Sequence, residues 1–206
     1  MQSQEPRLNI SHLHREINVD KSVGASRRSL NEGVFRTVQI ENKIIDVYIE
    51  IEKHSNIKYE FDKTVDQLLL DRILPYPYFY PYAYGFIPNT LAEDGDELDA
   101  LIITDRTNLS IDTYYKAYVV GVLLMEDEKG MDEKILVVPV HEYDTYNKIE
   151  IDNIINSEKL ENIFWFFSNY KNKTKDKWSK VYDYIEKENA VNLYKECKEK
   201  YMKSNV

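Results

Sequence analysis

The stretch Ile44-Ile45-Asp46-Val47-Tyr48-Ile49-Glu50-Ile51-Glu52 alternates apolar and polar side chains. Such alternation is typical of a half-buried β-strand, with the aliphatic side chains on one face and Glu50 on the other. Runs rich in β-branched and aromatic residues predict four further strands, over residues 57–61, 98–104, 114–125 and 134–140. Several short strands in succession predict a barrel or a sandwich.

The last third of the chain has a helical period instead. Apolar residues recur every three or four positions over residues 154–167, which predicts an amphipathic helix. A final helix is expected over about 185–203, where Cys197 shares a stripe with Val191, Tyr194 and Tyr201. Cys197 is therefore interpreted as a packing residue, and the chain is predicted to be a β core followed by C-terminal helices.

The length of 206 residues and the 43% apolar content suit one domain. We expect that domain over residues 41–206, and a flexible N-terminal extension over residues 1–40, where charges and serines follow no period. His12 and His14 could chelate a metal within this extension, but they are assigned no function. Its acidic residues argue against a transit peptide.

The composition also limits the partners. A net charge of −9 without a basic stripe predicts no binding to nucleic acid or to an anionic membrane surface, and no apolar run is long enough to span a bilayer. Cys197 is the only cysteine, so no disulfide can form within one chain, and a cytoplasmic location is expected. The glycine-rich phosphate loops of nucleotide-binding proteins are absent from the sequence.

The densest chemical signal is Asp94-Gly95-Asp96-Glu97-Leu98-Asp99, which has four carboxylates in six residues. Like charges so close together are costly unless cations share the site, and oxygen ligands suit Mg²⁺ or Mn²⁺. A calcium-binding EF-hand loop is excluded because Asp99 and Asp105 stand where that loop needs glycine and glutamate. A simple polar turn remains the alternative.

A second acidic pair, Asp127 and Asp132, lies in the polar link between two predicted strands. Taken alone, this link is typical of a solvated hairpin loop.

The two acidic segments, together with Lys58-Tyr59-Glu60, Asp71-Arg72 and Tyr84-Gly85-Phe86, resemble the family I soluble inorganic pyrophosphatases. The resemblance runs from about residue 44 to residue 178, and the family's D-x-D-x-x-D signature is met in full. It implies a mainly β fold with a five-stranded OB-type barrel flanked by C-terminal helices. It further implies Mg²⁺-dependent hydrolysis of pyrophosphate to two orthophosphates, and Mn²⁺ or Zn²⁺ could substitute for Mg²⁺. The resemblance also implies a homo-oligomer. A hexamer is favoured over a dimer.

The resemblance also implies a role for each matching position. Asp96 matches the general base beside the nucleophilic water. The implied metal ligands are Asp94, Asp99, Asp127, Asp132, Glu50 and Glu60. The implied phosphate-binding residues are Lys58, Arg72, Tyr84, Lys134, Tyr170 and Lys171. Each lysine taken alone could be a surface charge, so these roles depend on the joint match.

Some features depart from the family pattern or have no role in it. The loop between Glu50 and Lys58 is one residue shorter than in the bacterial enzymes, and Glu97 stands where proline is common. Tyrosines at every second position from 76 to 84 are expected to form one aromatic layer if the segment is extended, and Trp178 is expected to pack. Two other functions stay open: single-stranded nucleic-acid binding by the barrel, and metal binding without hydrolysis.

Overall fold

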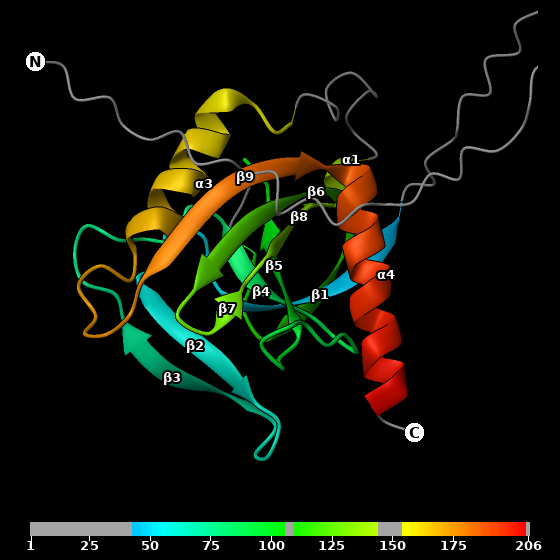
Figure 1. Cartoon of the computed structure of the whole chain (residues 1–206), viewed down its shortest axis with the longest axis horizontal. Coiled ribbons are helices and arrows are strands. Elements are labelled where there is room, and N and C mark those ends of the chain that lie inside the picture. The colour runs from blue at the N-terminus through cyan, green and yellow to red at the C-terminus, as the bar shows by residue number, and fades with distance from the viewer. Residues whose placement is uncertain (1–42, 106–108, 144–153, 205–206) are drawn as a thin grey trace, which may run out of the picture. The chain divides into compact units, whose positions relative to one another are not determined.

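The computed structural model describes residues 43–105, 109–143 and 154–204. The predicted extension at residues 1–40, with His12 and His14, lies outside these ranges. The strands are β1 Ile44–Ile51, β2 Ile57–Asp62, β3 Gln67–Ile73, β4 Ala83–Ile87, β5 Leu98–Ile102, β6 Thr113–Asp127, β7 Gly130–Met131, β8 Lys134–Pro139 and β9 Ser179–Glu186 (Figure 1). The helices are α1 Val140–Tyr143, α3 Ser157–Asn169 and α4 Lys187–Ser204.

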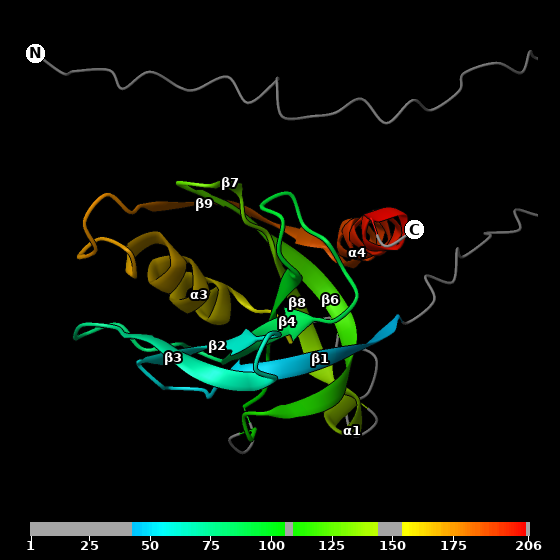
Figure 2. The ribbon, with the colours of Figure 1, turned by 90° about the horizontal axis from the view of Figure 1, so that it is seen from below.

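Five strands close into a ring in the order β1-β4-β5-β8-β6 and back to β1 (Figure 2). Strands β5 and β8 pair in parallel and the other neighbours are antiparallel. Numbered by their order along the chain, the ring strands run 1-2-3-5-4-1, a closed Greek-key order typical of an OB barrel. The expected five-stranded OB-type barrel is confirmed.

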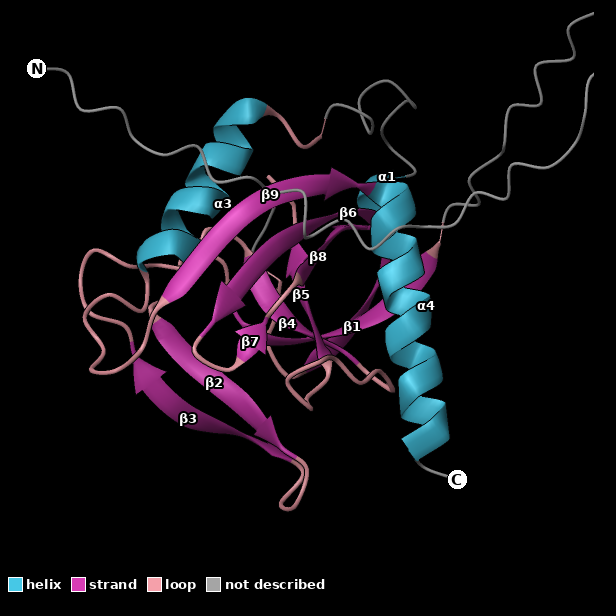
Figure 3. Cartoon of the chain, in the orientation of Figure 1, coloured by secondary structure: helices cyan, strands magenta, loops and turns pink. Residues whose placement is uncertain are grey.

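The long strand β6 closes the ring because its successive parts face different partners. Residues 113–118 of β6 pair with β1, residues 117–123 pair with β8, and residues 121–127 pair with β9. The β2–β3 hairpin forms a separate two-stranded sheet. Figure 3 shows this hairpin on one side of the barrel and α4 on the other.

The predicted strands all exist, and β1 is half-buried as predicted over residues 44–47, but the prediction is wrong for residues 48–51, which are buried on both faces. Tyr48 and Glu50 face away from the aliphatic side chains and are nevertheless only 3% and 8% exposed. The Tyr48 ring packs at centroid distances of 5.0 and 5.2 Å from Phe61 and Phe86, so the second face of β1 is covered in this half of the strand.

Two buried clusters form the core, each with one long helix packed on it. Val47, Ile49 and their neighbours pack with Val191 and Cys197 of α4, so the prediction that Cys197 packs in the core is confirmed. Phe166 and Phe167 of α3 pack in the second cluster. Helix α3 begins after Asn156, whose side chain accepts a hydrogen bond of 2.9 Å from the backbone N–H of Lys159.

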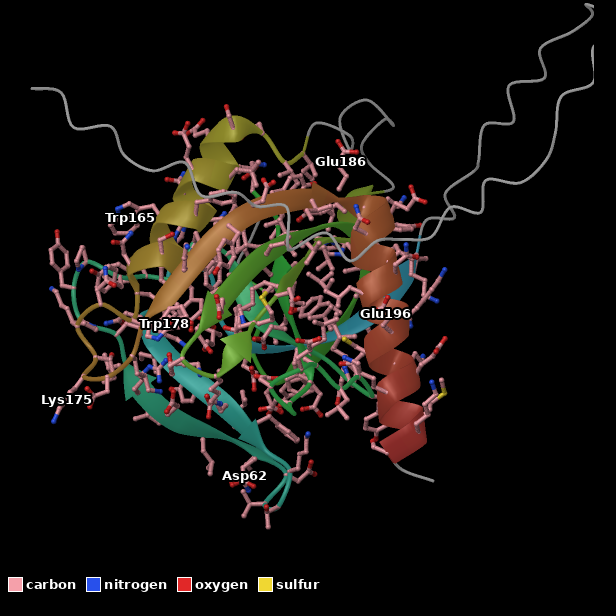
Figure 4. All side chains as sticks on the ribbon, viewed as in Figure 1. Asp62, Trp165, Lys175, Trp178, Glu186 and Glu196 are labelled. Atoms are coloured by element: carbon pink, nitrogen blue, oxygen red, sulfur yellow. The ribbon has the colours of Figure 1, made fainter. Side chains whose placement is uncertain are left out.

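The alternating tyrosines only partly form the expected layer. Tyr78, Tyr80, Tyr82 and Tyr84 are buried, whereas Tyr76 is 80% exposed because a turn interrupts the extended segment there. Trp178 is 43% exposed, so the expectation that it packs is wrong; Figure 4 places it where the chain enters β9. Within the described residues, no helix is long and apolar enough to cross a membrane.

Candidate active site

A pocket of about 350 Å³ opens against the barrel and the β2–β3 hairpin. All thirteen residues to which the resemblance assigns a role line this one pocket. They come from strands β1 to β6 and β8, from the loop between β4 and β5, from the link before β8, and from the segment after α3. Their roles remain predictions, but the fold brings residues 121 positions apart in the sequence, Glu50 and Lys171, into one site.

The loop between β4 and β5 carries Asp94 and Asp96 as a turn. Gly95 has φ +90°, a left-handed conformation that glycine adopts without strain, and the Asp96 N–H donates to Asp94 Oδ1 at 3.1 Å. Burial alone would raise the pKa of Asp96, but hydrogen bonds from Glu97, including its backbone N–H at 3.0 Å, lower the pKa overall. The segment is therefore a polar turn and also one wall of the pocket.

Asp99 and Lys134 meet because they are paired residues of the parallel strands β5 and β8. Lys134 is 1% exposed, and its ammonium group donates to Asp99 at 2.5 Å and to Asp132. Burial opposes the charge of Lys134, but the two carboxylates outweigh burial and raise the pKa of Lys134. Burial and the charge of Asp99 raise the pKa of Asp132 in spite of Lys134, as expected when two carboxylates share one cation.

The tight hairpin of β6 and β7 brings the second acidic pair back to the same pocket. Asp127 pairs with Gly130 across the hairpin, and the Asp132 N–H donates to Met125 O at 3.0 Å. Asp127 is 6% exposed and bonded to the buried ammonium group of Lys171. Burial acts against ionisation of Asp127, but Lys171 lowers the pKa. A solvated hairpin loop is therefore the wrong interpretation for Asp127.

The β2–β3 hairpin supplies both basic and acidic side chains to the pocket. Lys58 and Arg72 are cross-strand partners, and both approach Asp71 Oδ2, at 3.4 Å and 3.2 Å. Lys58 also forms an ion pair with Glu60, two residues further along β2. Opposite and alternate residues of a hairpin share a face, which explains why Lys58, Arg72 and Glu60 gather. Asp71 lies where the register shifts, without a cross-strand partner of its own.

Glu50 lies on the face of β1 that turns to the pocket. Its Oε1 accepts a hydrogen bond of 2.7 Å from the Phe61 N–H, which fixes the carboxylate. Burial, with the nearby charge of Asp99, raises the pKa of Glu50 to about 8. A cation beside Glu50 would therefore be needed to keep this carboxylate ionised at neutral pH.

Buried tyrosines form another wall. The Tyr84 ring lies 5.3 Å from the ring of Tyr80, and the Tyr170 ring stacks on Phe166 at 5.2 Å. Burial raises the pKa of both Tyr84 and Tyr170 well above the ordinary value, with Asp99 and Asp132 adding to the rise. These hydroxyls stay protonated at neutral pH and can donate hydrogen bonds.

The pocket contains residues to which the sequence argument gave no role in the site. They are Phe61, Lys63, Asp71, Tyr80, Phe86, Glu97, Glu128, Lys129 and Lys177. Some were visible as neighbours of motif residues: Asp71 precedes Arg72, and Glu128 follows Asp127. Lys63 pairs with Glu97 at 2.5 Å between the hairpin turn and the acidic loop, a contact that no local spacing signals.

The residue types fit a hard divalent cation. Ten carboxylate residues and seven basic residues line the pocket, so the carboxylates exceed the side-chain cations by three. All the acidic donors are oxygen atoms, the ligands that Mg²⁺ prefers. No cluster of three or more His, Cys, Asp or Glu residues is preassembled for a metal within the described ranges. Lysine ammonium groups instead lie between several of the carboxylates.

Known proteins share this sequence and fold. A family model described as inorganic pyrophosphatase matches residues 47–202. The chain is 43% identical over 156 residues to the inorganic pyrophosphatase of Helicobacter pylori strain J99, covering 75% of this chain and 90% of that protein. It is 46% identical over 158 residues to that of Nanoarchaeum equitans, covering 76% and 96%.

Solved structures agree. The inorganic pyrophosphatase of Helicobacter pylori has a TM-score of 0.73 at 40% identity, covering 80% of this chain and 99% of that one. The Thermus thermophilus enzyme has a TM-score of 0.72 at 36% identity, covering 80% and 94%. The chain is an enzyme of the hydrolase class. It belongs to the inorganic pyrophosphatase family.

Proposed function

We propose that this chain hydrolyses inorganic pyrophosphate to two orthophosphates, using Mg²⁺ held by the pocket carboxylates. The observation that carries the proposal is the convergence of all thirteen family-matched residues on one pocket. Bound Mg²⁺ would supply charge neutralisation for pyrophosphate and a lowered pKa for water. Mn²⁺ and Zn²⁺ are proposed as substitutes.

The carboxylates are proposed to divide into ligands and one base. Asp94, Asp99, Asp127, Asp132, Glu50 and Glu60 would hold the metal ions. Asp96 would accept a proton from the attacking water, and its place in the pocket beside the proposed metal ligands supports this, because a base must lie within reach of the water. The hydrogen bonds within the 94–97 turn hold its carboxylate toward the pocket.

The cationic and phenolic groups are proposed to bind the phosphoryl groups. A polyanion resists attack by water, so a protein aids the reaction by neutralising charge and aligning the attack. Lys58, Arg72, Lys134 and Lys171 supply fixed positive charges, of which Lys134 and Lys171 are almost inaccessible to water. Tyr84 and Tyr170 supply hydrogen-bond donors to phosphate oxygens.

The proposed setting of the enzyme is a cytoplasmic homo-oligomer, with a hexamer favoured over a dimer. The single buried thiol of Cys197 suits a reducing compartment. We propose neither nucleic acid nor membrane as a partner, since the net charge of −9 repels both.

Replacing Asp99 tests the metal assignment. Asp99→Ala is expected to weaken Mg²⁺ binding in calorimetry and to lower pyrophosphate turnover together, because the family resemblance implies that Asp99 contacts two metal ions. The control is Asp46→Ala, which removes an exposed carboxylate of β1 that pairs with Lys116 at 2.9 Å. Unchanged Mg²⁺ affinity with lost turnover would remove Asp99 from the ligand set.

A further inference from the structure

Three lysines of the pocket are each bonded to carboxylates proposed as metal ligands. Lys134 donates to Asp99 at 2.5 Å and to Asp132. Lys171 pairs with Asp127, and Lys58 pairs with Glu60. Four of the six proposed metal ligands therefore carry a lysine ammonium group as their direct partner.

The pairs of Lys134 and Lys171 are enclosed, because these lysine side chains are 2% and 7% exposed, so water screens them far less than it screens surface pairs. The Lys58–Glu60 pair is more open, since Lys58 is 17% and Glu60 58% exposed. Each lysine also has a second acidic neighbour in the pocket: Lys58 lies 3.4 Å from Asp71, and Lys171 lies 3.4 Å from Glu128. The negative charges of the carboxylates and the positive charges of the ammonium groups thus neutralise one another within the pocket.

We propose that these lysines act as exchangeable cations: they neutralise the metal-binding carboxylates until Mg²⁺ takes their place, and only then turn to the substrate. The inference rests on the proposed function, because it assigns Mg²⁺ to these carboxylates. An ammonium group and a divalent ion on the same carboxylate repel each other, so metal binding at Asp99 and Asp132 is expected to displace Lys134 from them.

The exchange gives the lysines two successive partners within one pocket. A lysine bonded to a carboxylate has little attraction left for phosphate, whereas a displaced lysine has an unpaired charge in an enclosed site. Metal is therefore expected to bind before pyrophosphate, and pyrophosphate alone is expected to bind weakly. The lysines also oppose metal binding, since each pair must be broken first.

Calorimetric titration of Mg²⁺ without pyrophosphate tests the exchange on the full chain. Removing a competing ammonium group with Lys134→Met is expected to lower the Kd for Mg²⁺ by about tenfold, the size of a close charge repulsion in a partly screened site. Lys58→Met repeats the test at a more accessible position, in case loss of the buried charge at position 134 prevents folding. Lys116→Met is the matched control, since Lys116 pairs with Asp46 at 2.9 Å outside the pocket.

Tighter Mg²⁺ binding by Lys58→Met or Lys134→Met, with Lys116→Met unchanged, supports the exchange. Unchanged or weaker Mg²⁺ binding by every folded pocket variant, while the unmodified chain binds Mg²⁺, overturns the exchange and leaves the proposed function standing. No Mg²⁺ binding by the unmodified chain overturns the proposed metal dependence and the exchange with it.

Discussion

Replacing Glu50 by glutamine is expected to stabilise the protein in the presence of a chelator, and more so as the pH rises. Burial raises the pKa of Glu50 from 4.5 to about 8, so the folded state favours the protonated, neutral side chain. This contribution to stability is fully present below pH 4.5 and is lost as the pH rises through 8. Glutamine is neutral at every pH and its Oε1 can keep the hydrogen bond from Phe61.

The size of the effect follows from the pKa. At about 1.4 kcal/mol per pH unit, the rise to about 8 corresponds to roughly 3–5 kcal/mol of unfolding free energy lost by pH 8.5. Urea denaturation at pH 5 and pH 8.5 with a chelator measures it in the unmodified chain and in Glu50→Gln. The difference in unfolding free energy between Glu50→Gln and the unmodified chain should grow by that amount from pH 5 to pH 8.5.

Glu52→Gln is the matched control, because Glu52 is exposed just beyond the end of the same strand. It should change the unfolding free energy little at either pH. Mg²⁺ should also stabilise the unmodified chain more than Glu50→Gln, since a divalent cation favours the ionised carboxylate. A difference between the unmodified chain and Glu50→Gln that stays constant with pH would refute the argument from burial.

Three further predictions concern single positions. Asp96→Asn should lower turnover by ~10²–10⁴ with Mg²⁺ affinity retained in calorimetry, as expected for a lost general base; unchanged turnover would remove Asp96 from that role. Gly85→Ala should lower the unfolding free energy measured by urea denaturation by at least about 3 kcal/mol, because the added Cβ would lie 1.8 Å from the Tyr48 carbonyl oxygen. A near-neutral change would contradict this packing. Lys134→Met should lower the unfolding free energy by about 3–5 kcal/mol with a chelator present, because it leaves two partly buried carboxylates without their cation. An unchanged unfolding free energy would show that these ion pairs contribute little to stability.

Local patterns were enough to predict five of the nine strands and the two long helices of the described residues. Alternation along residues 44–52 located β1, and the helical period over 154–167 located α3 to within three residues. Strand β4 was missed because all five of its residues are buried, so no polar face alternates with an apolar one. Strand β9 was missed because its first residues follow no clear period and its last two lay in the predicted helix.

The site was predictable as far as its residues resemble a family motif. The spacing of Asp94, Asp96 and Asp99 favoured a cation site, because such crowding needs compensation, but by itself it left a polar turn as the alternative. The raised pKa of Glu50 and the pairing of Lys63 with Glu97 depend on how the hairpin covers β1 and the acidic loop. These properties arise from tertiary contacts and have no sequence signal.

The central claim is that the pocket hydrolyses pyrophosphate with Mg²⁺. Phosphate release from pyrophosphate by the purified chain at neutral pH, with and without millimolar Mg²⁺ and with ATP as a comparison substrate, tests it most directly. We predict fast release that requires Mg²⁺ and is specific to pyrophosphate, with little release from ATP. No release from pyrophosphate with any divalent metal would contradict the claim and favour a protein that binds metal without hydrolysis.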